Sequence, residues 1–176
     1  MTDAGDGAGS PGDAGQGAAD ASANAAADAP RLSVTAQYVK DFSFENPNAP
    51  QSLAPPKEQP QIDVNVEVEA NLLAPDTYEV TLRITVTARN LETTLFVIEL
   101  LYAGLFRIEN IPEESLEAVC LIECPRLIFP FARRIIADGT RDGGFPPMLI
   151  DPIDFATLYR QRAQASKEAS PADADA

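Results

Sequence analysis

The chain has 176 residues, of which 45% are hydrophobic, and a formal net charge of -14. This length allows one ordinary domain with tails. The acidic charge argues against nucleic acid, whose phosphates require clustered lysine and arginine. No apolar run reaches the ~20 residues that a membrane-spanning helix needs, so we expect no direct insertion into a membrane.

The two ends of the chain differ in composition from its middle. Residues 1–30 consist almost entirely of Ala, Gly, Asp and Ser and contain no aromatic residue, lysine or arginine. Such a segment buries too little apolar area to offset the entropy of ordering it, so we expect a disordered tail. It also lacks the apolar core of a secretory signal, which favours a cytoplasmic protein. Residues 31–162 are expected to fold, and residues 163–176 to form a flexible C-terminal tail.

Four segments alternate between apolar and polar residues with the period of two that is typical of strands. They cover residues 32–39, 62–69, 78–87 and 94–107. A proline-rich stretch separates the first segment from the second, and short turns join the last three. We therefore predict an antiparallel meander with one long excursion after the first strand.

The fourth segment is unusual because both faces of the predicted strand are apolar. One face carries Phe96, Ile98, Leu100 and Tyr102, and the other carries Leu95, Val97, Glu99 and Leu101. A sheet that covers a single core does not need a second apolar face. We expect the extra face to contact a second layer, another subunit or an apolar ligand.

The chain after Ile111 is predicted to be helical, with apolar residues at helical spacing. Pro112 suits the first helical position, and Gly139 is expected to cap the C-terminus of this long helix. Pro125 and Pro130 lie inside the pattern, where each removes a backbone hydrogen bond, so we expect the helix to kink.

A second, C-terminal helix is predicted to begin at Asp151, with Asp151 as its N-cap and Pro152 at its first position. Strands that precede helices in the chain, rather than alternating with them, predict an α+β fold.

The residue types leave little room for catalysis. The chain contains no histidine, which excludes Ser-His-Asp and Cys-His nucleophiles and makes a metal site improbable. Cys120 and Cys124 are expected to be reduced and packed in the helical core, with a reactive redox pair as the less favoured alternative. No glycine-rich phosphate loop is present. We predict that the protein is not an enzyme and has no catalytic residue, cofactor or metal.

Carboxylate pairs are the remaining catalytic candidates. Glu67 and Glu69 share a predicted strand face, and Glu113 and Glu114 are adjacent at the predicted helix start. We interpret the first pair as solvated and the second as partners of the helix dipole. A carboxylate-dependent enzyme stays open as an alternative.

Residues 40–50 combine acidic and aromatic side chains in one predicted extended segment. Asp41, Ser43 and Glu45 point to one side of it, and Phe42 and Phe44 point to the other. The fourth strand has the same character, because Val97 and Glu99 lie opposite its aromatic and aliphatic face. Each segment therefore offers an acidic side and an apolar side. An alternative stays open, in which the aromatic residues only anchor the strand in the core.

Five strings along the chain form a recognisable set: Lys40-Asp-Phe-Ser-Phe-Glu-Asn-Pro-Asn-Ala-Pro50, Tyr78-Glu-Val-Thr-Leu-Arg-Ile-Thr-Val-Thr87, Cys124-Pro-Arg-Leu-Ile-Phe-Pro-Phe-Ala-Arg133, Gly144-Phe-Pro-Pro147 and Asp151-Pro-Ile-Asp-Phe155. Together they resemble the signature of SecB, a family of bacterial protein-export chaperones. The resemblance is ordered along the chain and covers about residues 32–161.

The resemblance implies a four-stranded antiparallel sheet followed by two helices, assembled into a homotetramer that is a dimer of dimers. It implies an ATP-independent chaperone that binds unfolded secretory precursor proteins in apolar grooves and delivers them to the SecA motor. Val97 stands where the family commonly has leucine, and Tyr102 stands where it often has a polar residue. By resemblance, the SecA-binding residues are Asp41, Glu45, Val97 and Glu99. The client-groove or subunit-contact residues are Phe42, Phe44, Phe96, Ile98, Leu100 and Tyr102.

A structural oligomer without client-holding activity stays open as the alternative function. In that case subunit contacts would cover the whole apolar strand, and no apolar surface would be left for an unfolded protein.

Overall fold

The computed structural model of the chain describes residues 29–55 and 58–168. The predicted disordered tail lies outside the described residues except for Ala29 and Pro30. The chain divides into two units at Pro30, and the second unit contains all the elements described below.

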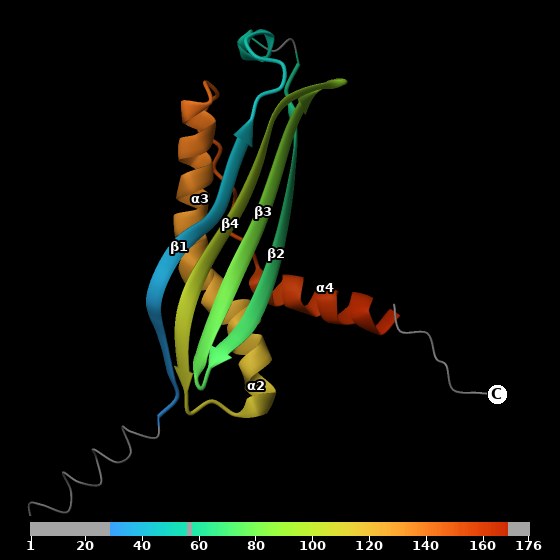
Figure 1. Ribbon diagram of the computed structural model, residues 1–176. Helices are drawn as coiled ribbons and strands as arrows, with labels where there is room; N and C mark the ends of the chain where they lie inside the picture. Colours follow the sequence, from blue (N-terminus) through green and yellow to red (C-terminus); the bar gives the residue numbers. More distant parts are fainter. Residues whose placement is uncertain (1–28, 56–57, 169–176) are drawn as a thin grey trace, which may run out of the picture. The chain divides into compact units, whose positions relative to one another are not determined.

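The second unit contains one four-stranded antiparallel sheet (Figure 1). Its strands are β1 (Arg31–Glu45), β2 (Gln61–Ala74), β3 (Thr77–Asn90) and β4 (Thr93–Glu109). The spatial order is β1-β4-β3-β2. The predicted meander is therefore right for β2, β3 and β4, but β1 pairs with β4 rather than with β2. The long excursion after β1, which includes the short 3-10 helix η1 (Gln51–Leu53), carries the chain from one edge of the sheet to the other.

The register of the strands sorts their side chains onto two faces. Ile84 lies opposite Leu100 and Val86 lies opposite Ile98, so the even-numbered residues of β3 and β4 share one face. Val66 and Val68 of β2 lie opposite Ile84 and Leu82 on that same face. The alternation in the sequence therefore predicts the inner face of the sheet correctly.

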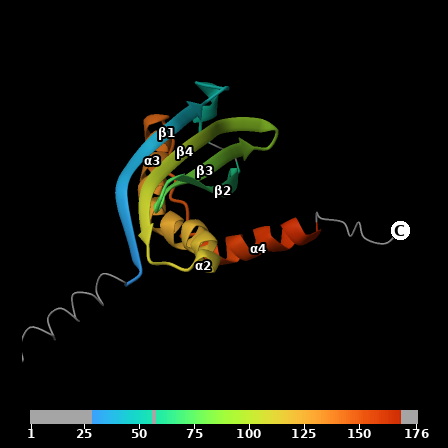
Figure 2. The same cartoon turned by 60° about the horizontal axis from the view of Figure 1, so that its bottom comes forward.

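The helical layer packs on this even-numbered face. The elements are α2 (Glu113–Ala118), the π-helical segment η2 (Val119–Glu123) and α3 (Cys124–Asp142). Both views place α2 and α3 on the same side of the sheet (Figures 1 and 2). The core that they close includes Leu82, Ile84, Val86, Ile98, Leu100, Phe106, Cys124, Ile128 and Ile136. Within the described residues no second layer covers the opposite face, where Val97, Leu101 and Leu105 are half-buried.

The proline-rich helix keeps its backbone helical through a π-turn. Glu123 and Cys124 both have right-handed helical dihedral angles, so η2 joins α3 without a break. In a π-turn each N–H pairs five residues back instead of four. The π-turn lies directly before Pro125 and accommodates the absence of a backbone N–H donor on this proline. The helix bends between α2 and α3, as its prolines predict (Figure 1).

Two predicted ends of the long helix are wrong by a few residues. Pro112 is the N-cap, and α2 begins at Glu113. At the other end α3 continues past Gly139 to Asp142, with Gly143 as its C-cap. Gly139 therefore does not cap the helix. A side chain is excluded at this position because a Cβ there would lie 2.6 Å from Cζ of Phe42. The ring of Phe42 takes the space of that side chain.

The last helix, α4 (Phe155–Glu168), also begins later than predicted. Asp154, rather than Asp151, caps it, because a carboxylate oxygen of Asp154 accepts from the backbone N–H of Thr157 at 3.1 Å. The helix continues beyond Ala163, from which the sequence predicts a flexible tail, to Glu168. It extends beyond the β2 edge of the sheet (Figure 2). Among the described residues, the helices are too short or too polar to cross a bilayer.

Thr140 joins the end of α3 to the segment that leads to α4. The side chain is fully buried. Its hydroxyl oxygen lies 3.0 Å from the carbonyl oxygen of Ala137, and it accepts from the backbone N–H of Met148 at 2.9 Å. The buried hydroxyl of Thr140 therefore satisfies a backbone donor that would otherwise lack a partner.

Replacing Thr140 by valine should lower the free energy of unfolding by about 1–3 kcal/mol, because the N–H of Met148 would stay buried without an acceptor. Denaturant unfolding measures the change. The control is Thr85→Val on the open face of β3, which should change stability by less than about 0.5 kcal/mol. Equal effects of the two substitutions would contradict the role given to Thr140.

Candidate binding surfaces on the sheet

Strand β2 has one unpaired edge, because it pairs with β3 on one side and is the last strand of the sheet. The carbonyl oxygen of Val68 accepts a hydrogen bond from the side chain of Arg162, so Val68 points its backbone polar groups away from β3. Residues two apart on a strand point these groups the same way. Val64, Val66, Val68 and Ala70 therefore present N–H and C=O groups outward, and we call this row the β2 edge.

The side chains beside the β2 edge are apolar and incompletely covered. Ile62 and Val64 are 48% and 41% exposed, whereas Val68 is 5% exposed. The reason is the width of the helical layer: α3 packs mainly on β1, β3 and β4, and β2 is contacted mainly by the short segment η2. The inner face of β2 therefore keeps a strip of apolar surface next to its unpaired backbone.

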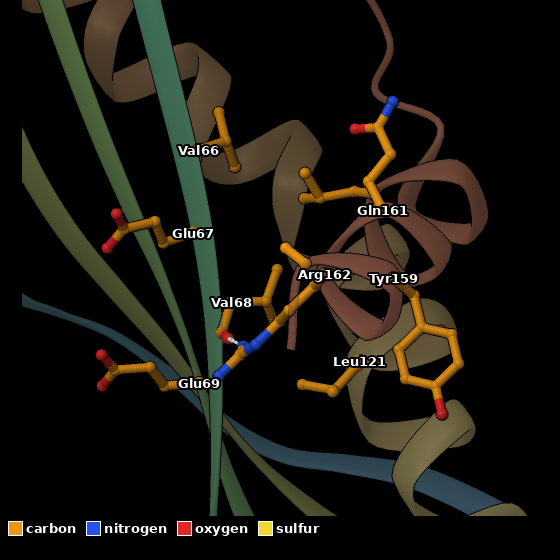
Figure 3. Close-up of a pocket in the computed structure, with 10 residues that line it drawn as sticks. Val66, Glu67, Val68, Glu69, Leu121, Tyr159, Gln161 and Arg162 are labelled. Carbon is orange, nitrogen blue, oxygen red and sulfur yellow. Dashed lines mark hydrogen bonds between the residues drawn. The ribbon is translucent and has the colours of Figure 1, made fainter. Parts of the chain in front are cut away.

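A groove of about 500 Å³ lies between β2 and α4 (Figure 3). It is lined by Val66, Glu67, Val68, Glu69, Leu121, Leu158, Tyr159, Gln161, Arg162 and Ala165. Figure 3 shows that Glu67 and Glu69 point away from α4, which leaves Val66, Val68 and Leu121 toward the helix. We call this space the upper groove.

A second groove, of about 530 Å³, continues along the same strand toward its hairpin. It is lined by Ala70, Leu72, Tyr78, Leu116, Glu117, Cys120, Leu121 and Arg162. We call it the lower groove. Leu121 and Arg162 line both grooves, so these two residues lie at the boundary between them.

An aromatic cluster lies at the other end of the sheet. The rings of Phe44 and Phe96 are stacked with centroids 5.8 Å apart, and Phe145 packs 4.9 Å from Phe96. Phe44 and Phe145 are half-buried. A Cβ on Gly143 would lie 2.1 Å from Cζ of Phe44, so only glycine leaves room for this ring. The cluster offers aromatic surface beside the excursion between β1 and β2.

The remaining residues predicted for the groove or subunit contacts have different positions. Ile98 and Leu100 are 0% and 1% exposed. They are core residues and do not reach the surface of the protein. Tyr102 is buried and donates through its hydroxyl to Oε1 of Gln37 at 3.2 Å. Phe42 is 38% exposed. Of this set, Phe42 and the half-buried Phe44 are thus available to a ligand, whereas Phe96 is only 5% exposed.

The four residues predicted to bind SecA lie together on the open face of the sheet. Glu45 is directly opposite Val97, and Ser43 is opposite Glu99. Asp41 pairs with Leu101, so it is a diagonal neighbour of Glu99. Asp41, Glu45 and Glu99 are exposed. We call this set the acidic face; it lies opposite the face that α2 and α3 cover.

A polar bridge beside the acidic face connects β1 to β3 across β4. The hydroxyl of Tyr38 and Nζ of Lys40 donate to the two carboxylate oxygens of Glu79, the latter at 2.9 Å. The hydrogen bond to Glu79 raises the pKa of Tyr38 to about 12, and the same bond lowers the pKa of the Glu79 carboxyl. Glu79 is therefore occupied within the sheet, unlike the exposed carboxylates around it.

The catalytic alternatives have little geometric support. Glu67 pairs with Arg83 at 3.8 Å on the solvent side. Cys120 and Cys124 are free and buried, as predicted. A hydrogen bond with Cys120, followed by burial, raises the pKa of the Cys124 thiol, which disfavours a reactive thiolate there. Within residues 29–55 and 58–168 no group of three metal-ligating side chains is present.

Some surface residues were not identified as candidates from the sequence. Arg162 and Tyr159 belong to a helix whose end was expected to be flexible. Val66 belongs to a regular half-exposed strand, and its position at a sheet edge cannot be recognised from alternation. Phe145 carried a usable signal, because a lone aromatic residue between glycine and two prolines lies outside any helical face.

Comparison with known proteins identifies the family. Residues 25–166 match the family described as Preprotein translocase subunit SecB. The Protein-export protein SecB of Parvibaculum lavamentivorans is 59% identical over 145 residues, which are 82% of this chain and 86% of that protein. The protein of the same name from Rhodopseudomonas palustris is 57% identical over 150 residues, covering 85% and 91% of the two chains.

A solved structure has the same fold at low sequence identity. It is the SecB-like chaperone Rv1957 of Mycobacterium tuberculosis in complex with a peptide from the antitoxin HigA1, with a TM-score of 0.59 and 18% identity. The matched region covers 74% of this chain and 95% of the Rv1957 chain. Because the matched family consists of export chaperones and not of enzymes, the prediction of a non-enzymatic protein is confirmed. The chain belongs to the SecB family of protein-export chaperones.

Proposed function

We propose that the protein is an ATP-independent chaperone of the cytoplasm. It holds unfolded precursor proteins in a translocation-competent state and delivers them to the SecA motor for export. The observation that carries this proposal is the β2 edge, an unpaired row of backbone groups flanked by a mainly apolar upper groove and a lower groove of mixed polar and apolar lining.

An extended client segment can add to the sheet as a fifth strand at the β2 edge. Its backbone then pairs with Val64, Val66, Val68 and Ala70 regardless of its sequence. Its apolar side chains enter the upper and lower grooves, where burial contributes about 25 cal/mol per Å². Both contributions require an unfolded client, because a folded protein keeps its strands paired and its apolar side chains inside. The binding therefore selects for the unfolded state without consuming ATP.

The aromatic cluster supports a second client contact. Phe42, Phe44 and Phe145 present aromatic surface near the excursion after β1, and the buried Phe96 packs against Phe44 and Phe145. Two separated contacts on one subunit, multiplied by the subunits of an oligomer, raise the effective affinity for a long unfolded chain. Ile98, Leu100 and Tyr102 act here by holding the surface residues in place.

The acidic face is proposed to bind SecA through Asp41, Glu45, Val97 and Glu99. Three exposed carboxylates around one half-buried apolar residue suit a partner with basic residues around an apolar contact. Because this face is opposite the client grooves in the layer order, a subunit can hold a client and SecA together. Exposed charges are screened by salt, so SecA binding should weaken as ionic strength rises.

The subunits are proposed to assemble as a homotetramer, a dimer of dimers. Leu127 and Phe131 of α3 are both 45% exposed and lie one helical turn apart, so they form an uncovered apolar stripe on the helical layer. A helix packed against the same stripe of another subunit would cover it. If such contacts also covered the β2 edge, the alternative of a purely structural oligomer would hold.

The purified protein should delay the aggregation of a chemically unfolded protein without added nucleotide, as measured by light scattering. Val64→Asp should weaken client binding about tenfold or more, because it places a charge in the apolar strip. Asn65→Asp is the matched control, since it adds the same charge on the opposite face of the same strand. An equal loss in both variants, or no delay by the unaltered protein, would contradict the proposed client site.

Charge reversal at Asp41 and Glu99 together should abolish SecA binding while client capture stays unchanged. The physical reason is repulsion of a basic partner surface from lysines on the acidic face. Isothermal titration with SecA and the aggregation assay measure the two activities separately. Lysines at Asp142 and Asp151, both exposed outside the sheet, give the same net charge and should leave both activities intact. Loss of both activities in the first variant would contradict the separation of faces.

Phe131→Asp should reduce the mass of the assembly in solution, because a carboxylate would be buried in the proposed contact between α3 helices. Analytical ultracentrifugation measures the mass. Leu149→Asp changes a 65% exposed leucine outside the helical layer and should leave the assembly unchanged. An unaltered tetramer in the Phe131 variant would move the subunit contact away from this stripe.

A further inference from the structure

Arg162 stands between the two grooves along the β2 edge. It projects from α4 toward the strand, and its Nη1 donates to the carbonyl oxygen of Val68 at 2.6 Å (Figure 3). The upper groove begins on one side of this contact and the lower groove on the other, and Arg162 lines both. The contact joins residues that are 94 positions apart in the chain, so it depends on the fold and not on local sequence.

The acceptor of this hydrogen bond is one that an added strand would need. Val68 lies in the middle of the β2 edge, with Val64 and Val66 on one side and Ala70 on the other. A client backbone that pairs along the whole edge must donate to the carbonyl of Val68. A guanidinium that already donates to this oxygen occupies the same position. Unpaired strand edges are also sites of unwanted pairing between copies of a protein, and a charged side chain on the edge suppresses it.

We propose that Arg162 is a displaceable partition across the β2 edge, and that it sets the length of client segment the chaperone accepts. This inference rests on the proposed function. With the partition in place, a short segment binds only one groove and makes few backbone bonds. A longer extended segment displaces the guanidinium from Val68, pairs with the β2 edge on both sides of this residue and occupies both grooves, which β2 lines from Val66 to Leu72. At ~3.3 Å per residue this trough is about 20 Å long.

The partition explains a preference for unfolded chains over short loops of folded proteins. A loop offers a few extended residues and does not recover the hydrogen bond that it breaks at Val68. A long unfolded segment recovers it, because its own N–H group replaces the guanidinium and further bonds form on both sides. Arg162 therefore acts as a specificity-determining residue through competition for one carbonyl oxygen.

Arg162→Met tests the proposal, because methionine keeps an apolar stem against the groove but has no donor. The probe is a fluorescently labelled peptide of about nine residues with alternating leucine and serine, long enough to span the trough at ~3.3 Å per residue. Fluorescence anisotropy should show about fivefold tighter binding to the variant, the factor that one net hydrogen bond contributes. A peptide of about four residues, which fills one groove at most, should bind both proteins equally.

Two controls separate the partition from a general effect of charge or of helix stability. Arg160→Met removes the same charge from the same helix, where Arg160 donates to Oγ1 of Thr157 at 2.8 Å; it should leave the affinity unchanged. Methylating alternate backbone nitrogens of the long peptide removes its donors, so the gain in the Arg162 variant should disappear. Circular dichroism monitors the helix content of both variants.

The outcomes distinguish this inference from the proposed function. If the unaltered protein binds the long peptide and Arg162→Met binds it equally or more weakly, Arg162 is a brace for α4 and the partition is wrong. If the methylated peptide keeps the gain, competition for the Val68 carbonyl is wrong. If neither the unaltered protein nor the variant binds the long peptide, the proposed client site at the β2 edge fails as well.

Discussion

The helical layer of this protein is narrower than the sheet that it covers. Helix α3 packs mainly on β1, β4 and β3, and β2 is contacted mainly by the short π-helical segment η2. The core is closed over the middle strands, where Ile84, Ile98 and Leu100 are almost completely buried. What the layer leaves uncovered is the inner face of β2 at Ile62 and Val64, next to the unpaired backbone of the same strand. The client grooves and the role of Arg162 follow from this mismatch in width.

The same two-layer arrangement gives the two faces of the sheet different partners. The inner face supplies apolar strips next to an open edge, and the outer face supplies exposed carboxylates on β1 and β4 around Val97. Because residues alternate between faces along a strand, one strand can contribute to both surfaces without mixing their chemistry. In β1 this puts Phe44 in the aromatic cluster and its neighbour Glu45 on the acidic face.

The sequence contains enough local information for the elements and the family but not for the surfaces. Alternation predicts four strands and the inner face of the sheet, and the prolines predict a bend in the long helix. The spatial order of β1 and β4 depends on where a long excursion crosses the sheet, which no local pattern encodes. Gly139 is a residue type that is typical of helix caps, yet its role in the structure is to leave space for the ring of Phe42. Likewise Val66 has the pattern of a core residue, and only the position of β2 at the edge makes it a groove residue.

Hydrogen exchange at single backbone amides tests the central claim most directly. The amides of Val64, Val66, Val68 and Ala70 have no strand partner in the free protein, so they should exchange fast. The account predicts that an unfolded client slows the exchange of these four amides, whereas Asn65, Glu67 and Glu69, which point toward β3, stay protected with or without it. Unchanged exchange along β2, with client protection at other strands or at α3, would contradict the account.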